Sequence, residues 1–296
     1  MSADFWVIST GILTATACGL IGSFLVLRQN SMLGDAISHA VLPGLALAFL
    51  ITSSRNVVPM IVGAGITGLV TAYLIEVLSG TGRLYRDASL AVIFTFLFSV
   101  GVILVTLYAG QIDLDQECVL FGEIAYAPWD VVIIGSTNYG PRSIWILGAV
   151  FLADLLFILL FYKQLKICTF DPELARSVGI SPRRWHYLLM AMVSLTIVAA
   201  FELVGAILVV AMLIIPGATA FLLTRRLHQM LLLSIVVGII SAAGGFYSAA
   251  YFDVSIAGSM AVVGGIVFAL AAFGSRIRTR RKANPQPGTS PAEQTR

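Results

Sequence analysis

Charged side chains are scarce in this sequence. Asp, Glu, Lys and Arg make up 11% of its 296 residues, whereas hydrophobic residues make up 58% and the mean hydropathy is +0.95. A soluble globular domain carries about 25% charged residues, so this chain has less than half the charge that a water-exposed surface requires. The composition excludes an ordinary soluble domain and indicates a polytopic membrane protein whose surface is covered by lipid.

Cysteine and catalytic motifs are also sparse or missing. Cys18, Cys118 and Cys168 are scattered without CxxC spacing, which argues against a disulfide framework or a thiolate metal site. No GxxxxGK[ST], HExxH or GxSxG pattern occurs, so the chain is not itself a P-loop ATPase, and we expect no enzyme activity of its own. The N-terminal MSADFW has no basic residues before the first apolar run, so we expect no cleaved signal peptide.

Apolar runs of membrane-crossing length recur along the chain, and a span needs about 20 residues. The sequence predicts spans at roughly 8–27, 33–50, 58–78, 88–108, 143–162, 186–200, 203–223, 230–250 and 256–273. Only Glu202 separates the short sixth run from the seventh, so these two are either one broken helix or a tight hairpin. We therefore expect an all-α transmembrane bundle of eight or nine spans, occupying residues 1–275.

Basic residues predict the orientation of this bundle. With nine spans and the N-terminus outside, sixteen of the 18 Lys and Arg residues fall on the cytoplasmic side, and only Arg55 and Arg142 fall outside. This asymmetry follows the positive-inside rule, so the positive charge marks a cytoplasmic face and not a nucleic-acid surface. Residues 276–296, basic and then rich in Pro, Ser, Thr and Gln, are expected to form a disordered cytoplasmic tail.

Two connecting segments are longer than a simple turn requires. The outer one, 109–142, has apolar stretches that suggest it folds back on the membrane, and it carries five acids: Asp113, Asp115, Glu117, Glu123 and Asp130. These acids would concentrate cations, or they simply avoid the inner side. In the inner segment, 163–184, Asp171-Pro172-Glu173 is typical of a helix start, and Gly179 would end that helix. The result is a short docking helix or an ordinary amphipathic loop.

The most suggestive polar residues lie in the second run, MLGDAISHAVLPG. Asp35 and His39 are four residues apart, so on a helix they share a face. A carboxylate with an imidazole suits Mn²⁺, Fe²⁺ or Zn²⁺, and Pro43 with Gly44 can kink the helix and expose carbonyls to a cavity. Alternatively, Asp35 caps the helix and His39 packs against a neighbour.

Asp253 is a second candidate ligand, near the outer end of the eighth run. It lies among Tyr247, Tyr251 and Ser255 and could add a carboxylate to a metal path. Aromatic residues at a membrane edge are also common as interfacial anchors, so the tyrosines alone do not indicate a site.

Four further ionisable residues are weaker candidates for a functional role. Glu202 fits the membrane interface as well as a functional role, and Asp154 is expected to hydrogen-bond a neighbouring helix. His186 and His228 lie at predicted cytoplasmic ends beside arginines, which makes them poor candidates for metal ligands.

The segment SMLGDAISHAVLPGLALAF resembles the second-span signature of metal ABC transporter permeases, which import manganese, zinc or iron. LVGAILVVAMLIIPGATA and FDPELARSVGIS resemble two further motifs of that family. DLDQECVLFGEIAY and FDVSIAGSM are similar to the subgroup often encoded as one of two paired permeases in manganese-type systems. The motifs occur in the family's order over roughly residues 10–275.

This resemblance implies a site, a set of partners and a location. The intramembrane metal site would include Asp35 and His39. The partners would be a cytoplasmic ABC ATPase dimer, a second permease (paralogue or self copy) and an extracytoplasmic metal-binding protein, in the lipid of a bacterial inner membrane. The coupling helix, about 170–180, would dock on the ATPase. Its expected contact residues are Phe170, Asp171, Pro172, Glu173, Leu174, Ala175 and Gly179.

The chain departs from the family's pattern in the eighth run. Many members carry a histidine where this chain has Tyr247, Tyr251 and Asp253. Oxygen ligands suit Mn²⁺ or Fe²⁺ better than Zn²⁺, so we expect a divalent transition metal with manganese favoured. The alternative is an ion-coupled secondary carrier without an ATPase, in which Asp35, Glu202 or Asp253 relays protons.

Overall fold

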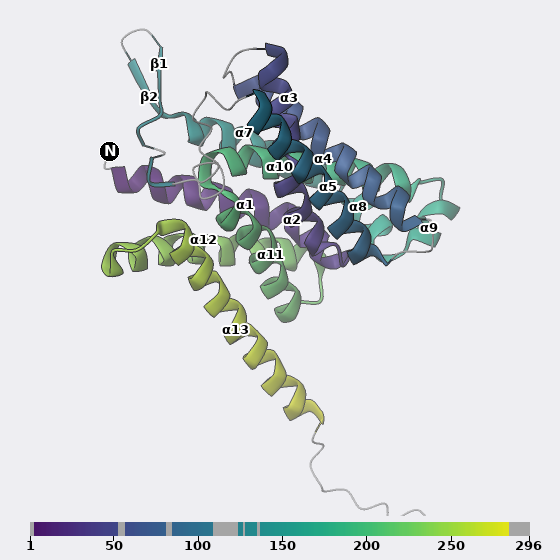
Figure 1. Cartoon of the computed structure of the whole chain (residues 1–296). Coiled ribbons are helices and arrows are strands. Elements are labelled where there is room, and N and C mark those ends of the chain that lie inside the picture. The colour runs from purple at the N-terminus through teal and green to yellow at the C-terminus, as the bar shows by residue number, and fades with distance from the viewer. Residues whose placement is uncertain are drawn as a thin grey trace, which may run out of the picture.

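The computed structural model describes residues 3–52, 57–80, 85–108, 124–126, 128–134 and 137–283. Within these ranges nine helices are long and apolar enough to cross a membrane. Eight of the spans are single helices (Figure 1), namely α1 (Ala3–Leu27), α4 (Val57–Gly80), α5 (Arg86–Tyr108), α7 (Arg142–Leu160), α10 (Pro182–Val204), α11 (Ala206–Leu223), α12 (Leu227–Phe252) and α13 (Ile256–Ala283). The predicted all-α membrane bundle is confirmed.

The remaining span, Ser31–Thr52, consists of two helices. α2 (Ser31–Ala40) and α3 (Leu42–Thr52) are separated at Val41. Proline has no backbone N–H, so Pro43 cannot donate to the carbonyl of His39, the residue four positions earlier. The kink that the sequence predicts near Pro43 is therefore present as a break in the second span.

Gly205 decides between eight and nine spans. It lies between α10 and α11 with φ 83° and ψ 161°, a backbone conformation that is essentially restricted to glycine. The predicted sixth and seventh runs are therefore two helices joined by one residue. The sixth is also longer than predicted, since its apolar span covers Pro182–Phe201.

α1 lies at the centre of the bundle and is the most buried of the spans, whereas α5 and α13 are the least buried. Small residues bring α1 close to α11: a Cβ built on Gly22 would lie 1.7 Å from the Leu213 carbonyl oxygen, and one on Gly217 would lie 3.1 Å from Ser23. α13 extends away from the bundle toward its C-terminal end (Figure 1). The exposed apolar sides of α5 and α13 are suited to lipid or to another membrane subunit.

Short elements complete the described chain. They are the 3₁₀ turn η1 (Ile124–Tyr126), the strands β1 (Val131–Ile134) and β2 (Thr137–Pro141), α8 (Tyr162–Phe170) and α9 (Pro172–Ser177). β1 and β2 pair antiparallel, with Val131 opposite Pro141 and Ile134 opposite Thr137. This strand pair was not predicted. Its β-branched residues Val131, Val132, Ile133 and Ile134 favour a strand.

The predicted tail boundary differs from the structure. α13 runs on to Ala283, beyond residue 275, because Arg and Lys are good helix formers. Residues 284–296 lie outside the described residues, as do four of the five acids of the outer segment: Asp113, Asp115, Glu117 and Glu123.

Candidate metal-translocation site

Asp35 and His39 lie together on α2. The Nε2 atom of His39 is 3.5 Å from Oδ1 of Asp35, and 32% of the His39 side chain and 47% of the Asp35 side chain remain exposed. The other face of α2 is buried. Gly34 packs under Leu213 of α11, and Ile37 packs against Gly68 of α4. This packing holds the carboxylate and the imidazole on the accessible face of the helix.

Aromatic side chains of α5 line the imidazole. The ring of His39 lies 6.0 Å from that of Phe94 and 5.9 Å from that of Phe98, centroid to centroid, with Phe98 in an edge-on arrangement. The site thus has one polar wall from α2 and one apolar wall from α5. Sequence reasoning missed both phenylalanines because α5 is apolar along its whole length and offers no signal for a special position.

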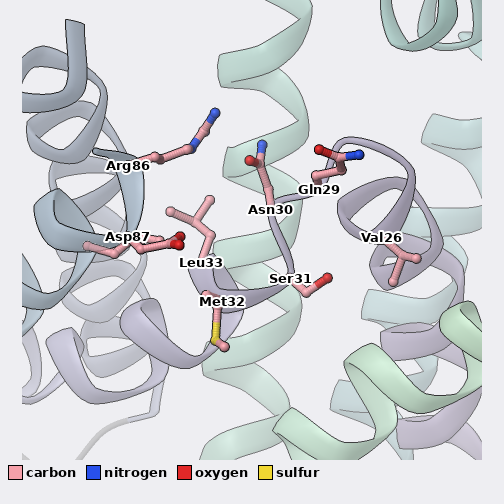
Figure 2. Close-up of a pocket in the computed structure, with 9 residues that line it drawn as sticks. Val26, Gln29, Asn30, Ser31, Met32, Leu33, Arg86 and Asp87 are labelled. Carbon is pink, nitrogen blue, oxygen red and sulfur yellow. The ribbon is translucent and has the colours of Figure 1, made fainter. Parts of the chain in front are cut away.

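A pocket opens at the start of the site helix. Its volume is about 340 Å³, and it is lined by Val26, Gln29, Asn30, Ser31, Met32, Leu33, Arg86, Asp87 and Leu90. Asp87 extends toward Met32 and Leu33 (Figure 2). Ser31 precedes Asp35 by about one helical turn, so this polar pocket lies next to the candidate site.

Among the residues that the structure describes, no third candidate ligand lies with Asp35 and His39. The described residues contain no group of three His, Cys, Asp or Glu side chains that could hold a metal ion. Asp253 is exposed in the turn between α12 and α13, with φ 53°, where it lines a separate pocket of about 280 Å³ with Ile124 and Ala125. The side chain of Glu202 lies outside the described residues.

Asp154 is fully buried in α7, and its predicted hydrogen bond to a neighbouring helix is confirmed. The Thr196 hydroxyl of α10 donates to Oδ2 of Asp154 over 2.8 Å. This bond joins two spans in the core and places Asp154 among the residues that hold the bundle together.

We expect Thr196→Val to lower the stability of the folded protein by about 1–3 kcal/mol, because it leaves a buried carboxyl oxygen without its donor. Asp154→Asn retains an oxygen that can accept from Thr196 and is the matched control. Unfolding of both variants in detergent measures the difference. Equal stability of Thr196→Val and wild type would contradict a stabilising role for this bond.

The short helix predicted in the inner segment is present as α9. Asp171 caps it by accepting a hydrogen bond from the Leu174 N–H at 2.9 Å, Pro172 occupies the first turn, and the chain turns at Gly179 with φ 79°. Such capping fixes where a helix starts. α9 is shorter than the predicted 170–180, and α8 precedes it as an additional helix that the sequence did not predict.

Exposed apolar side chains lie on α9 and directly before and after it. Ala175 is fully buried, whereas Phe170, Leu174 and Val178 are exposed. Phe170 ends α8, Leu174 lies in α9 and Val178 follows its last residue. The backbone of Asp171 is non-helical (φ −144°), so the three side chains do not share the face of one helix. Exposed apolar side chains of this kind are suited to contact with another protein.

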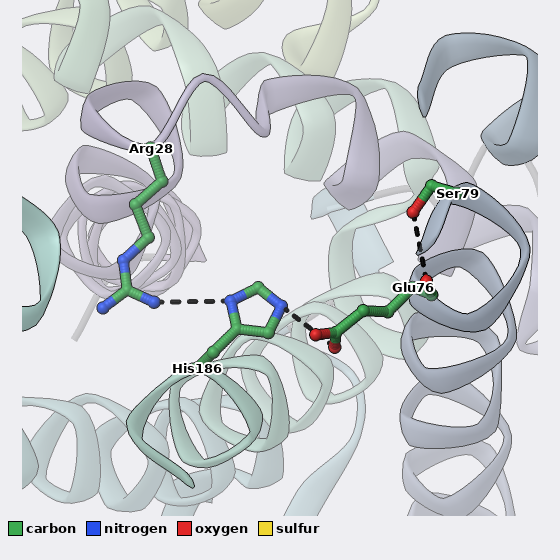
Figure 3. A network of polar contacts seen from close by, with 4 residues as sticks. All are labelled: Arg28, Glu76, Ser79 and His186. Atoms are coloured by element: carbon green, nitrogen blue, oxygen red, sulfur yellow. Dashed lines mark hydrogen bonds and ion pairs between the residues drawn. The ribbon is translucent and has the colours of Figure 1, made fainter. Parts of the chain in front are cut away.

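A polar network at the ends of α1, α4 and α10 was not predicted (Figure 3). Arg28 Nη1 lies 3.4 Å from His186 Nδ1, and His186 Nε2 lies 3.8 Å from Glu76 Oε2. Burial lowers the pKa of the Arg28 guanidinium, while nearby Cys168 acts in the opposite direction. The signal available in the sequence was Glu76 itself, an acid inside the predicted span 58–78.

The fold and the candidate site together define the class of membrane protein to which the chain belongs. The chain is a multi-pass membrane protein with an accessible carboxylate–imidazole pair inside its second span, and ionisable residues at such positions mark substrate or ion pathways.

Comparison with known proteins then identifies the family. Residues 3–275 match the ABC 3 transport family, and the chain belongs to it. It is 47% identical over 271 residues to "Manganese transport system membrane protein MntD" of Bacillus subtilis, covering 92% of each chain. It is 43% identical over 264 residues to "Zinc transport system membrane protein TroD" of Treponema pallidum, covering 89% of this chain and 72% of TroD.

A solved structure supports the same assignment. The chain matches "PsaBC from Streptococcus pneumoniae in complex with Fab" with a TM-score of 0.79 and 31% identity, covering 96% of each chain. The predicted resemblance to metal ABC transporter permeases is therefore confirmed.

Proposed function

We propose that this chain is the membrane-spanning subunit of an ATP-driven importer for a divalent transition metal, with Mn²⁺ as the favoured substrate. The observation that carries the proposal is the Asp35–His39 pair, 3.5 Å apart and accessible on a helix whose opposite face is packed. The names of the MntD and TroD relatives support a metal substrate. A carboxylate with a single imidazole favours Mn²⁺ or Fe²⁺ over Zn²⁺.

In this proposal the chain binds and gates the cation, and a separate subunit supplies the energy. A hydrated cation exchanges part of its water shell for Asp35 and the neutral imidazole of His39, beside the apolar wall of Phe94 and Phe98. The pocket next to Ser31 is the proposed exit toward the cytoplasm. Asp253, in its own pocket at the α12–α13 turn, would meet the cation before it enters the membrane.

The proposed assembly follows from the missing phosphate-binding loop and from exposed apolar side chains near α9. Its sequence holds no phosphate-binding loop, so hydrolysis needs a cytoplasmic ABC ATPase dimer. The exposed apolar side chains of Phe170, Leu174 and Val178, on and beside α9, are suited to dock on it. A second permease copy or paralogue would complete the pathway, and an extracytoplasmic metal-binding protein would deliver the cation. The N-terminus would lie outside and the C-terminus in the cytoplasm of a bacterial inner membrane.

Uptake of Mn²⁺ into proteoliposomes tests the proposal. The vesicles contain the complete complex of this chain, its second permease, the ATPase and the extracytoplasmic binding protein. We expect Mn²⁺ accumulation to require ATP and to continue after a protonophore collapses the proton gradient. Accumulation that proceeds without ATP and stops with the protonophore would contradict the proposal and support the secondary carrier.

A further inference from the structure

We propose that Arg28 is the joint that transmits movement of α9 to the helices holding the metal site, which makes it a positioning residue for transport. This inference rests on the proposed function, since it takes α9 to be the helix that the ATPase moves. Its basis is the set of contacts that Arg28 makes at the end of α1.

Arg28 contacts two other elements through different nitrogen atoms. Its Nε donates to the Thr169 hydroxyl at 3.2 Å, and its Nη1 lies 3.4 Å from Nδ1 of His186. Thr169 is the penultimate residue of α8, two positions before Asp171, which caps α9. One rigid guanidinium therefore ties the α8–α9 junction to α10.

The chemistry of these groups fixes how the network continues. Arginine can only donate hydrogen bonds, so Nδ1 of His186 accepts and the ring proton is on Nε2. That atom faces Oε2 of Glu76 on α4 (Figure 3). The order of the network is thus a cation on Arg28, a neutral imidazole on His186 and a carboxylate on Glu76.

The network is incompletely bonded in this conformation. The 3.8 Å between His186 and Glu76 exceeds hydrogen-bond distance. Among the described residues, Glu76 Oε2 and Arg28 Nη2 are buried without a hydrogen-bond partner. A movement of α4 toward α10 by less than 1 Å would close the His186–Glu76 bond. In the proposed coupling, the network changes between this arrangement and one in which the His186–Glu76 bond is closed, as a mechanical coupling element requires.

α4 connects this network to the metal site. Gly68 lies two helical turns before Glu76. At Gly68, α4 packs closely against Ile37 of α2 and Ser194 of α10. The Ser194 hydroxyl also donates to the Gly65 carbonyl at 3.2 Å. Ile37 lies between Asp35 and His39 in the sequence, so a displacement of α4 acts on the backbone that carries both ligands.

A second cation site at the same place fits the structure less well. The charged groups that act on His186 are Glu76 together with two cations, Arg28 and Arg86. Two arginines around one imidazole repel a divalent cation. The two arginines would repel a bound cation, whereas in a coupling network Arg28 pairs with His186 and the Glu76 carboxylate offsets part of the arginines' positive charge.

The test measures the Mn²⁺-to-ATP ratio, which is the number of Mn²⁺ ions transported per ATP hydrolysed. The measurement uses proteoliposomes that hold the complete complex. We expect Arg28→Gln to lower the Mn²⁺-to-ATP ratio at least tenfold, while ATP hydrolysis stays within twofold of wild type and Mn²⁺ binding to the purified permease is unchanged. Thr169→Val removes only the α8 contact and should lower the ratio by a smaller factor. Arg184→Gln, an exposed arginine at the same end of α10, is the matched control and should leave the ratio unchanged.

A double-mutant cycle guards against a purely structural effect. If Arg28 and Glu76 act in one network, Arg28→Gln with Glu76→Gln should reduce the ratio no further than Arg28→Gln alone. The coupling role of Arg28 would be contradicted if transport and hydrolysis fell in equal proportion in Arg28→Gln and Thr169→Val, or if the ratio were unchanged in both. Either result would leave the proposed function intact. A wild-type complex without ATP-driven Mn²⁺ uptake would instead overturn the proposed function.

Discussion

Asp35→Asn is expected to weaken Mn²⁺ binding to the purified permease by more than about 100-fold, beyond the 10–100-fold effect of changing a group that only supports a ligand. The substitution keeps the shape of the side chain but removes its negative charge. Asp35 and His39 are 3.5 Å apart, so a cation between them contacts both. His39→Ala should produce a loss of the same order, and equilibrium dialysis with Mn²⁺ measures both variants.

Two controls separate loss of a ligand from loss of structure. Ser38→Ala changes the buried neighbour of His39, whose hydroxyl bonds only within α2, and should bind Mn²⁺ as wild type does. His228→Ala removes an exposed imidazole from α12 and should also have no effect. Wild-type affinity in both Asp35→Asn and His39→Ala would remove these residues from the site.

Gly22→Ala is expected to prevent normal assembly of the bundle. The added methyl carbon would lie 1.7 Å from the Leu213 carbonyl oxygen and 2.7 Å from its carbon, so α1 and α11 would have to separate. Backbone atoms cannot rotate away as a flexible side chain can, and we expect a destabilisation of about 3 kcal/mol or more, at the upper end of overpacking effects. The yield of monodisperse protein in detergent and its thermal unfolding measure this loss.

Gly265→Ala is the matched control for this change. A Cβ built on Gly265 of α13 meets nothing within 4 Å, so the same substitution should leave yield and unfolding temperature close to those of wild type. A Gly22→Ala protein that assembles and unfolds like the Gly265→Ala protein would show that the two central helices adjust without loss.

Features that depend on one helix could be predicted from the sequence. The carboxylate–imidazole pair follows from a spacing of four residues, the start of α9 from Asp171-Pro172, and the break in the second span from Pro43. Each rests on local geometry, and each is found in the structure. The positions of the spans could also be predicted from the sequence, because a span in lipid needs about 20 mainly apolar residues.

Features that depend on contacts between helices could not be predicted in this way. Arg28, Glu76 and His186 come from three helices far apart in sequence, and no periodicity shows that their side chains meet. The separation of Asp253 from the α2 pair is likewise a property of packing. The sequence offered a short interruption at Glu202 but could not distinguish one broken helix from two, because the answer lies in the backbone angles of Gly205.

The break at Val41 has a mechanical consequence for the span that carries Asp35 and His39. Gly34 and Ile37 pack α2 against three other helices, whereas the bond that would stiffen its continuation into α3 is absent because of Pro43. Pivoting of α3 therefore disrupts one interaction fewer than bending an unbroken helix at the same point. α3 is therefore hinged to α2 at Val41, two residues after His39.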